Sequence, residues 1–73
     1  MIVRDYHHYT VDEALADASR LVGYVRTSGR IDDAEFIVGH GQIQHRLIAL
    51  LNSYGLIATV KLSNTGVVRC LIE

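Results

Sequence analysis

The feature that most constrains the fold is the alternation of short β-forming segments with two amphipathic helical stretches. Thr10 to Glu13 has the pattern of a capping box, in which the Thr10 hydroxyl accepts from the amide of Glu13 while the Glu13 carboxylate accepts from the amide of Thr10. A one-sided apolar stripe at spacings of three and four follows and predicts a helix from there to about Thr27. Its members are Val11, Ala14, Leu15, Ala18, Leu21, Val22 and Val25. We expect Leu15, Ala18, Leu21 and Val22 to be buried.

A second helical stripe begins at Gln42, and Gly55 is placed to end it. Its apolar members are Ile43, Leu47, Leu50, Leu51 and Tyr54, of which we expect Leu47, Leu50 and Leu51 to be buried. Four segments rich in β-formers surround the two helices: residues 2–7, 34–38, 56–62 and 67–72. Residues 63–66 (SNTG), between the last two segments, are residue types that favour a turn, and Gly66 is the one best suited to a positive φ there.

The predicted order is therefore βαβαββ within one domain, residues 1–73. Crossover connections between parallel strands are right-handed, so both helices must cover the same face of a single sheet. The predicted fold class is an α/β (α+β) two-layer sandwich, with two helices on one face of a four-stranded mixed sheet.

Composition narrows the functional classes. Hydrophobic residues make up 49% and charged residues 21%, which is typical of a soluble globular domain. No apolar run reaches the ~18 residues of a membrane span, and the first residues are polar where a signal peptide is apolar, so we expect a cytoplasmic protein without a membrane partner. The single cysteine, Cys70, excludes an internal disulfide. A net charge of -1 argues against a strong non-specific polyanion binder but leaves room for a local basic patch.

Two unusual segments fall at the ends of the predicted parallel strands, where ligands bind in open α/β sheets. The first, "RDYHHYT", spans residues 4–10. Residues two apart on a strand share a face, so Asp5 and His7 should pair while Tyr6 and His8 point the other way. A carboxylate–imidazole pair can perform general acid–base catalysis, with Asp5 and His7 as the candidate catalytic residues. The alternative is an ordinary hydrogen bond within a loop.

The second segment, Gly39-His40-Gly41, precedes the helix that begins at Gln42. Glycines let backbone amides approach a ligand closely, and a helix N-terminus favours negative charge. We expect the amides of Gly41 and Gln42 to form an anion pocket beside Asp5 and His7, with Arg46 extending a basic rim. The alternative is a tight strand-to-helix turn without a ligand. A divalent metal held by His7, His8, His40 and Asp5 is a further option, although no HExxH pair or cysteine set supports a defined site.

The run "DYHHYTVDEAL" (residues 5–15) resembles the Asp-Leu-His-Gly-Leu-Thr-Val-Glu-Glu-Ala-Leu signature that opens the small MutS-related (Smr) domain. "GHG" (residues 39–41) sits where that family has a Gly-x-Gly motif, and the resemblance covers nearly the whole chain. It implies nucleic-acid binding or endonuclease activity on DNA or RNA, with the first motif associated with cleavage and the second with nucleic-acid contact. That fold is also similar to the C-terminal domain of the third bacterial initiation factor, which implies the sheet order 1-2-4-3.

Asp5 and His7 match the acid and the histidine of the first family motif, and Gly39 and Gly41 match the glycines of the second. Several other positions depart from the motifs: Arg4 replaces a leucine, His8 a glycine, Val38 a threonine or histidine, and His40 a frequent lysine. Three hypotheses follow: an Smr-like nuclease or nicking enzyme, a nucleic-acid-binding module without catalysis, and a protein–protein interaction domain that forms a homodimer through an exposed sheet edge.

Overall fold

The computed structural model describes all residues of the chain, 1–73. It contains six elements: β1 (Ile2–Asp5), α1 (Val11–Thr27), β2 (Asp32–Ile37), α2 (Gln42–Ser53), β3 (Ala58–Lys61) and β4 (Asn64–Ile72). The predicted βαβαββ order is confirmed. Gly55 follows α2 with φ +80°, the left-handed conformation expected of a glycine that ends a helix.

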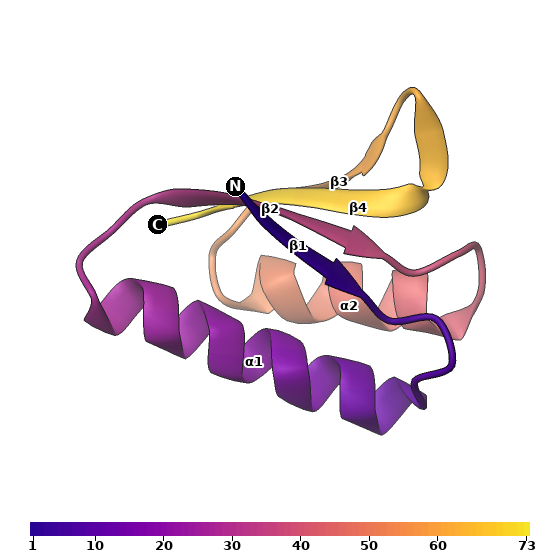
Figure 1. Cartoon of the computed structure of the whole chain (residues 1–73), viewed down its shortest axis with the longest axis horizontal. Helices are drawn as coiled ribbons and strands as arrows, with labels where there is room; N and C mark the ends of the chain where they lie inside the picture. The colour runs from indigo at the N-terminus through magenta and orange to yellow at the C-terminus, as the bar shows by residue number, and fades with distance from the viewer.

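The four strands form one mixed sheet in the order β1-β2-β4-β3. β1 runs parallel to β2, with Asp5 opposite Ile37, and β4 pairs antiparallel with both β2 and β3. Both helices lie on the same side of the sheet (Figure 1), which confirms the two-layer sandwich. The connections from β1 to α1 and from β2 to α2 consequently leave the same end of the sheet (Figure 1).

The core lies between the helices and one face of the sheet. The helices contribute Ala14, Ala18, Leu21, Val22, Val25, Leu47 and Leu51, and the strands contribute Ala34, Phe36, Ala58, Val68, Cys70 and Ile72, all of them buried. Leu15 and Leu50, which we expected to be buried, are only half-buried because they lie at the margins of their stripes. Gln44 is buried instead, and its side-chain amide donates to the backbone carbonyl of Thr65.

The other face of the sheet carries no helix. Lys61 and Glu35 form an ion pair across it, with Nζ 3.2 Å from the carboxylate. The same face also exposes apolar side chains: Val3, Ile37 and Leu71 are 54%, 39% and 45% exposed. We refer to this surface, defined by these five residues, as the open face.

The hairpin between β3 and β4 corrects one prediction. The chain reverses at Leu62 and Ser63, because Lys61 already pairs with Asn64. Residues 65–67 then interrupt the register before Val60 pairs with Val68. Gly66 lies in β4 without a positive φ, so the prediction of a left-handed turn residue there is wrong. The Asn64 side chain accepts from the Gly66 amide at 3.1 Å, which bends this stretch without left-handed backbone.

Gly66 instead provides a close approach between two segments. A Cβ at this position would lie 3.5 Å from the Cα of Gly39 and 3.6 Å from the His40 ring. The Gly66 carbonyl accepts from the amides of Val38 and Gly39, at 2.9 and 3.0 Å. The turn of β4 therefore holds the β2–α2 loop (residues 38–41) in place.

Candidate functional site

The β1–α1 loop (residues 6–10) is anchored by Tyr6. This side chain is 1% exposed, and its ring stacks on Phe36 with centroids 5.7 Å apart. Its hydroxyl donates to the Asp17 carboxylate at 2.7 Å. Burial, with the hydrogen bond to Asp17, raises the pKa of Tyr6 above its ordinary value, so the phenol remains a proton donor. The predicted capping box is confirmed, with distances of 3.1 and 2.9 Å between Thr10 and Glu13, and it fixes the other end of the loop.

Asp5 and His7 pair as predicted. Asp5 Oδ1 accepts from the backbone amide of His7 at 3.0 Å and lies 2.8 Å from His7 Nδ1. The backbone hydrogen bond, followed by the imidazole hydrogen bond, lowers the pKa of Asp5, so its carboxylate is ionised at neutral pH. An ionised carboxylate only accepts hydrogen bonds, so His7 Nδ1 must carry the hydrogen. In the neutral ring His7 Nε2 then keeps a free lone pair, and 67% of the His7 side chain is exposed.

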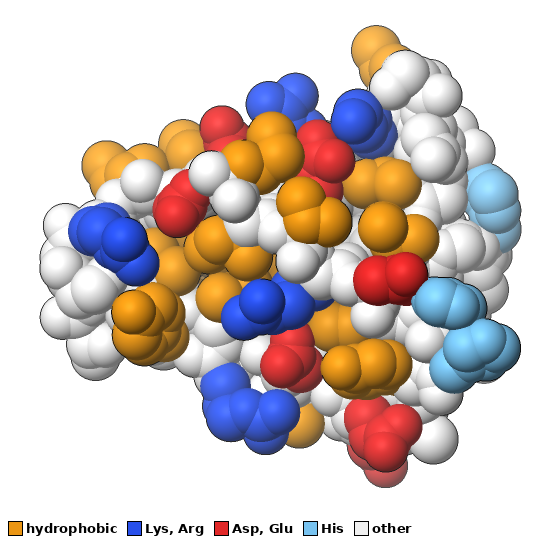
Figure 2. Space-filling model, viewed as in Figure 1, with side chains coloured by type: hydrophobic (Ala, Val, Ile, Leu, Met, Phe, Trp, Pro, Cys, Tyr) orange, Lys and Arg blue, Asp and Glu red, His pale blue; other side chains and the backbone are white.

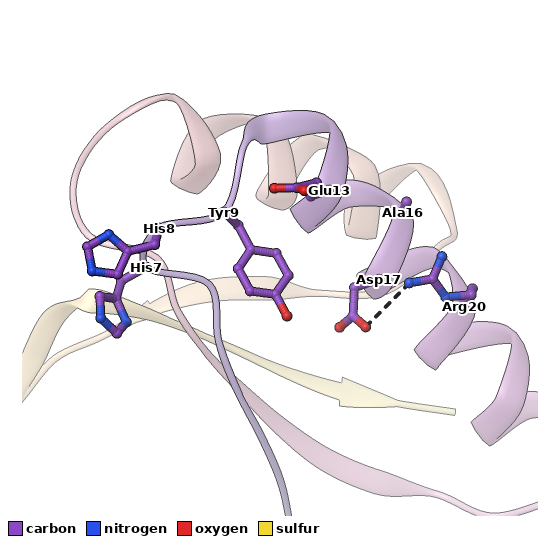
Figure 3. Close-up of a pocket in the computed structure, with 7 residues that line it drawn as sticks. All are labelled: His7, His8, Tyr9, Glu13, Ala16, Asp17 and Arg20. Carbon is purple, nitrogen blue, oxygen red and sulfur yellow. Dashed lines mark ion pairs between the residues drawn. The ribbon is translucent and has the colours of Figure 1, made fainter.

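His8 does not point away from His7, and that prediction is wrong. It assumed that strand geometry continues through both histidines, whereas β1 ends at Asp5. His8 has φ +70°, a left-handed conformation that brings its ring beside that of His7, with centroids 4.3 Å apart (Figure 3). His8 is the one residue other than glycine with positive φ.

An open groove of about 540 Å³ lies between the β1–α1 loop and α1 (Figure 3). It is lined by His7, His8, Tyr9, Glu13, Ala16, Asp17 and Arg20. The Tyr9 ring packs on Tyr6 with centroids 5.1 Å apart while remaining 43% exposed. Sequence reasoning did not identify the α1 residues of this groove. Their spacing of three and four along one helix stripe, next to the histidines, is the signal that would have found them.

Asp17 is the most connected side chain of the groove. Besides the hydroxyl of Tyr6, its carboxylate meets Arg4 Nε at 3.3 Å and Arg20 at 3.7 Å. Its charge is thus largely balanced by protein groups, and it joins β1, the loop and α1.

The β2–α2 loop has a different local structure. Gly39 has φ +69°, and Gly41 is the N-cap of α2 without any side-chain hydrogen bond to the first turn. No acidic residue lies in that turn. Gln42 and Arg46 are exposed on α2. The positive end of this helix is therefore not balanced by a side chain of its own first turn.

His40 is turned toward β4. Its Nε2 lies 2.8 Å from the Thr65 hydroxyl, and the buried Gln44 amide donates to the Thr65 carbonyl at 2.7 Å. The β1–α1 loop and the β2–α2 loop lie at one end of the sheet because β1 and β2 are parallel. Histidine side chains gather at this end (Figure 2). The groove takes no residue from the β2–α2 loop or α2, since none of Gly39, Gly41, Gln42 or Arg46 lines it.

No group of three or more histidine, cysteine, aspartate or glutamate side chains is arranged to hold a metal ion. Neither α1 nor α2 combines the length and the apolar content that crossing a bilayer requires. In comparisons with known proteins, no family model, curated protein or solved structure matches the chain.

Proposed function

We propose that this protein binds DNA or RNA and cleaves phosphodiester bonds at the end of the sheet where β1 and β2 finish. The observation that carries the proposal is the Asp5–His7 pair, in which a fixed carboxylate orients an exposed imidazole. The resemblance of residues 5–15 and 39–41 to the two Smr motifs supports the same function, and we propose that the chain is a divergent Smr-like domain acting in the cytoplasm.

His7 is proposed as the general acid–base group. With Nδ1 hydrogen-bonded to Asp5, the Nε2 lone pair can accept a proton from the attacking hydroxyl, either of water or, in RNA, of a ribose. As that oxygen bonds to phosphorus, the P–O bond to the leaving oxygen breaks, and the leaving oxygen takes a proton from solvent. The Asp5 carboxylate then stabilises the imidazolium that forms. A group in this role contributes typically ~10²–10⁴-fold to the rate.

The start of α2 is proposed to hold the phosphate. The first turn of α1 disfavours anions, since Asp12 and Glu13 lie in it and the capping box uses the amides of Thr10 and Glu13. The first turn of α2 has neither a side-chain cap nor an acid, so the amides near Gly41 and Gln42 can meet a phosphate. Arg46 on the exposed side of α2 adds a basic rim.

The test is cleavage of labelled single- and double-stranded DNA and RNA, each with a divalent metal and with a chelator. His7→Ala should abolish cleavage while leaving the thermal midpoint and most of the binding intact. His45→Ala removes another exposed histidine outside the pair and serves as the matched control, with wild-type rates expected. If the wild-type protein binds nucleic acid without cutting it, a binding module replaces the enzyme. If it does neither, the proposal is wrong.

A second candidate function is protein–protein interaction, for example as a homodimer. The open face favours it, because Val3, Ile37 and Leu71 remain exposed on a sheet face that no helix covers. Light scattering distinguishes this candidate from the first: a dimer that dissociates in Leu71→Glu, with no nucleic-acid shift at low salt, would favour it.

A further inference from the structure

We infer that the groove between the β1–α1 loop and α1 takes an unpaired nucleobase next to the phosphate that is cleaved, so the substrate is a single strand. This inference rests on the proposed function and adds the form of nucleic acid to it. It concerns the groove defined above, which the sequence did not predict as a site.

The position of the groove sets what can enter it. His7 and His8 form one end, so any group in the groove lies directly beside the proposed general base. Figure 3 shows the Tyr9 ring between the two imidazoles and the ion pair of Asp17 with Arg20. In a nucleotide chain the group beside a reacting phosphate is a sugar with its base.

The charges of the groove exclude a phosphate from its middle. The carboxylates of Glu13 and Asp17 both line it. Arg4 and Arg20 balance the charge of Asp17, whereas Glu13 has no cationic partner and would repel an anion. An uncharged base is attracted instead, because carboxylates accept hydrogen bonds from the amino and imino groups of base edges. Arg20, which is 74% exposed at the far end, can reach the following phosphate.

Tyr9 supplies a stacking surface. Its ring is 43% exposed and is supported from beneath by the buried Tyr6, so it needs little ordering when a base stacks on it. A base within a duplex has its faces covered by neighbouring bases and its pairing edge occupied. Only an unstacked base, as in a single strand or a loop, can use both the ring and the carboxylates.

The test measures the affinity of labelled single strands and of duplexes of the same sequence by fluorescence anisotropy. Ala16→Leu fills the groove at an exposed helix position with another strong helix former, so the fold should be retained. Tyr9→Leu removes the stacking ring. Each change should weaken single-strand binding by about 5- to 100-fold, the range of a lost base–aromatic stack, and leave duplex binding unchanged.

The matched controls are Ala49→Leu, at an exposed position of α2, and Tyr24→Leu, which removes a tyrosine of α1 that is 63% exposed outside the groove. Both should bind single strands as the wild type does. The inference is overturned if Ala16→Leu and Tyr9→Leu bind single strands no more weakly than their controls do. It is also overturned if these variants lose as much affinity for duplexes as for single strands. In both cases the proposed function stands. If the wild-type protein binds no nucleic acid, both are overturned.

Discussion

The two strand-to-helix loops start from neighbouring parallel strands, yet they are built in opposite ways. The β1–α1 loop is held by side chains: the buried Tyr6, the Asp5–His7 pair and the capping box of Thr10. The β2–α2 loop is held mainly by its backbone, through the Gly66 carbonyl, with the His40–Thr65 hydrogen bond as its side-chain link. One loop is rich in reactive side chains, and the other leaves backbone amides near the solvent.

This difference suggests a division of roles. A helix whose first turn is capped and acidic cannot attract a phosphate, whereas an uncapped helix start can. The proton-transfer group and the anion site are therefore assigned to separate loops that the parallel pairing of β1 with β2 places at one end of the sheet. The following substitutions test that contrast, from the largest expected effect on stability to the smallest.

Tyr6→Ala should be the most damaging change in the side-chain-built loop. It removes a fully buried ring together with the hydrogen bond to Asp17, so the free energy of unfolding should fall by about 3–5 kcal/mol. Urea denaturation measures this. Tyr6→Phe retains the ring and should lose only about 1 kcal/mol. Equal losses in the two variants would show that the packing of the ring does not hold the loop.

Each loop has a residue in the left-handed conformation, and substitutions at these two positions should change the free energy of unfolding in opposite directions. Gly39→Ala places a Cβ on backbone with φ +69° and should lower the free energy of unfolding by about 1–2 kcal/mol. His8→Gly relieves the same strain at φ +70°, partly offset by a more flexible unfolded chain, and should raise it by up to about 1 kcal/mol. Thermal unfolding of both variants checks the signs. A destabilised His8→Gly would mean that the contact between the tilted rings of His7 and His8 stabilises the loop by more than the strain destabilises it.

Gly41→Asp should separate stability from binding. The position is open, because a Cβ added there would have no heavy atom within 4 Å beyond its chain neighbours, so an aspartate can cap α2 and raise stability by a few tenths of a kcal/mol. Its charge would stand where the phosphate is proposed to bind, and nucleic-acid affinity should fall about tenfold or more. Gly41→Asn supplies the cap without the charge and should retain most of the affinity. Unchanged binding in Gly41→Asp would exclude the start of α2 as the anion site.

The fold was largely predictable because its determinants are local. The capping box, the two apolar stripes and the glycine after α2 each fix an element within a few residues. The hairpin turn was misplaced because "SNTG" contains strong turn residues, yet Leu62 and Ser63 make the reversal. Gly66 lies against Gly39, and a contact between residues so far apart in the sequence leaves no local pattern.

The site was predictable in part, for the same reason. The Asp5–His7 pair was predicted from the two-residue period of a strand, and it is present. Because β1 ends at Asp5, the hydrogen bond from the His7 amide to the Asp5 carboxylate holds the pair instead. The position of His8 does not follow, since the strand ends earlier and the backbone turns left-handed. The groove combines the loop with one stripe of α1 and depends on how Tyr6 and Asp17 fix their relative position. Tertiary contacts of this kind cannot be predicted from the spacing of residues along the sequence.

The most direct test of the central proposal is an NMR titration of ¹⁵N-labelled protein with a single-stranded oligonucleotide of about ten nucleotides, a length within the usual site sizes. The amides of residues 5–9 and 39–43 should shift together and saturate with one affinity, because both loops contact the same strand. Shifts confined to the open face, around Val3, Glu35 and Leu71, would contradict the proposal and place any binding on the uncovered side of the sheet. The absence of any shift would contradict nucleic-acid binding itself.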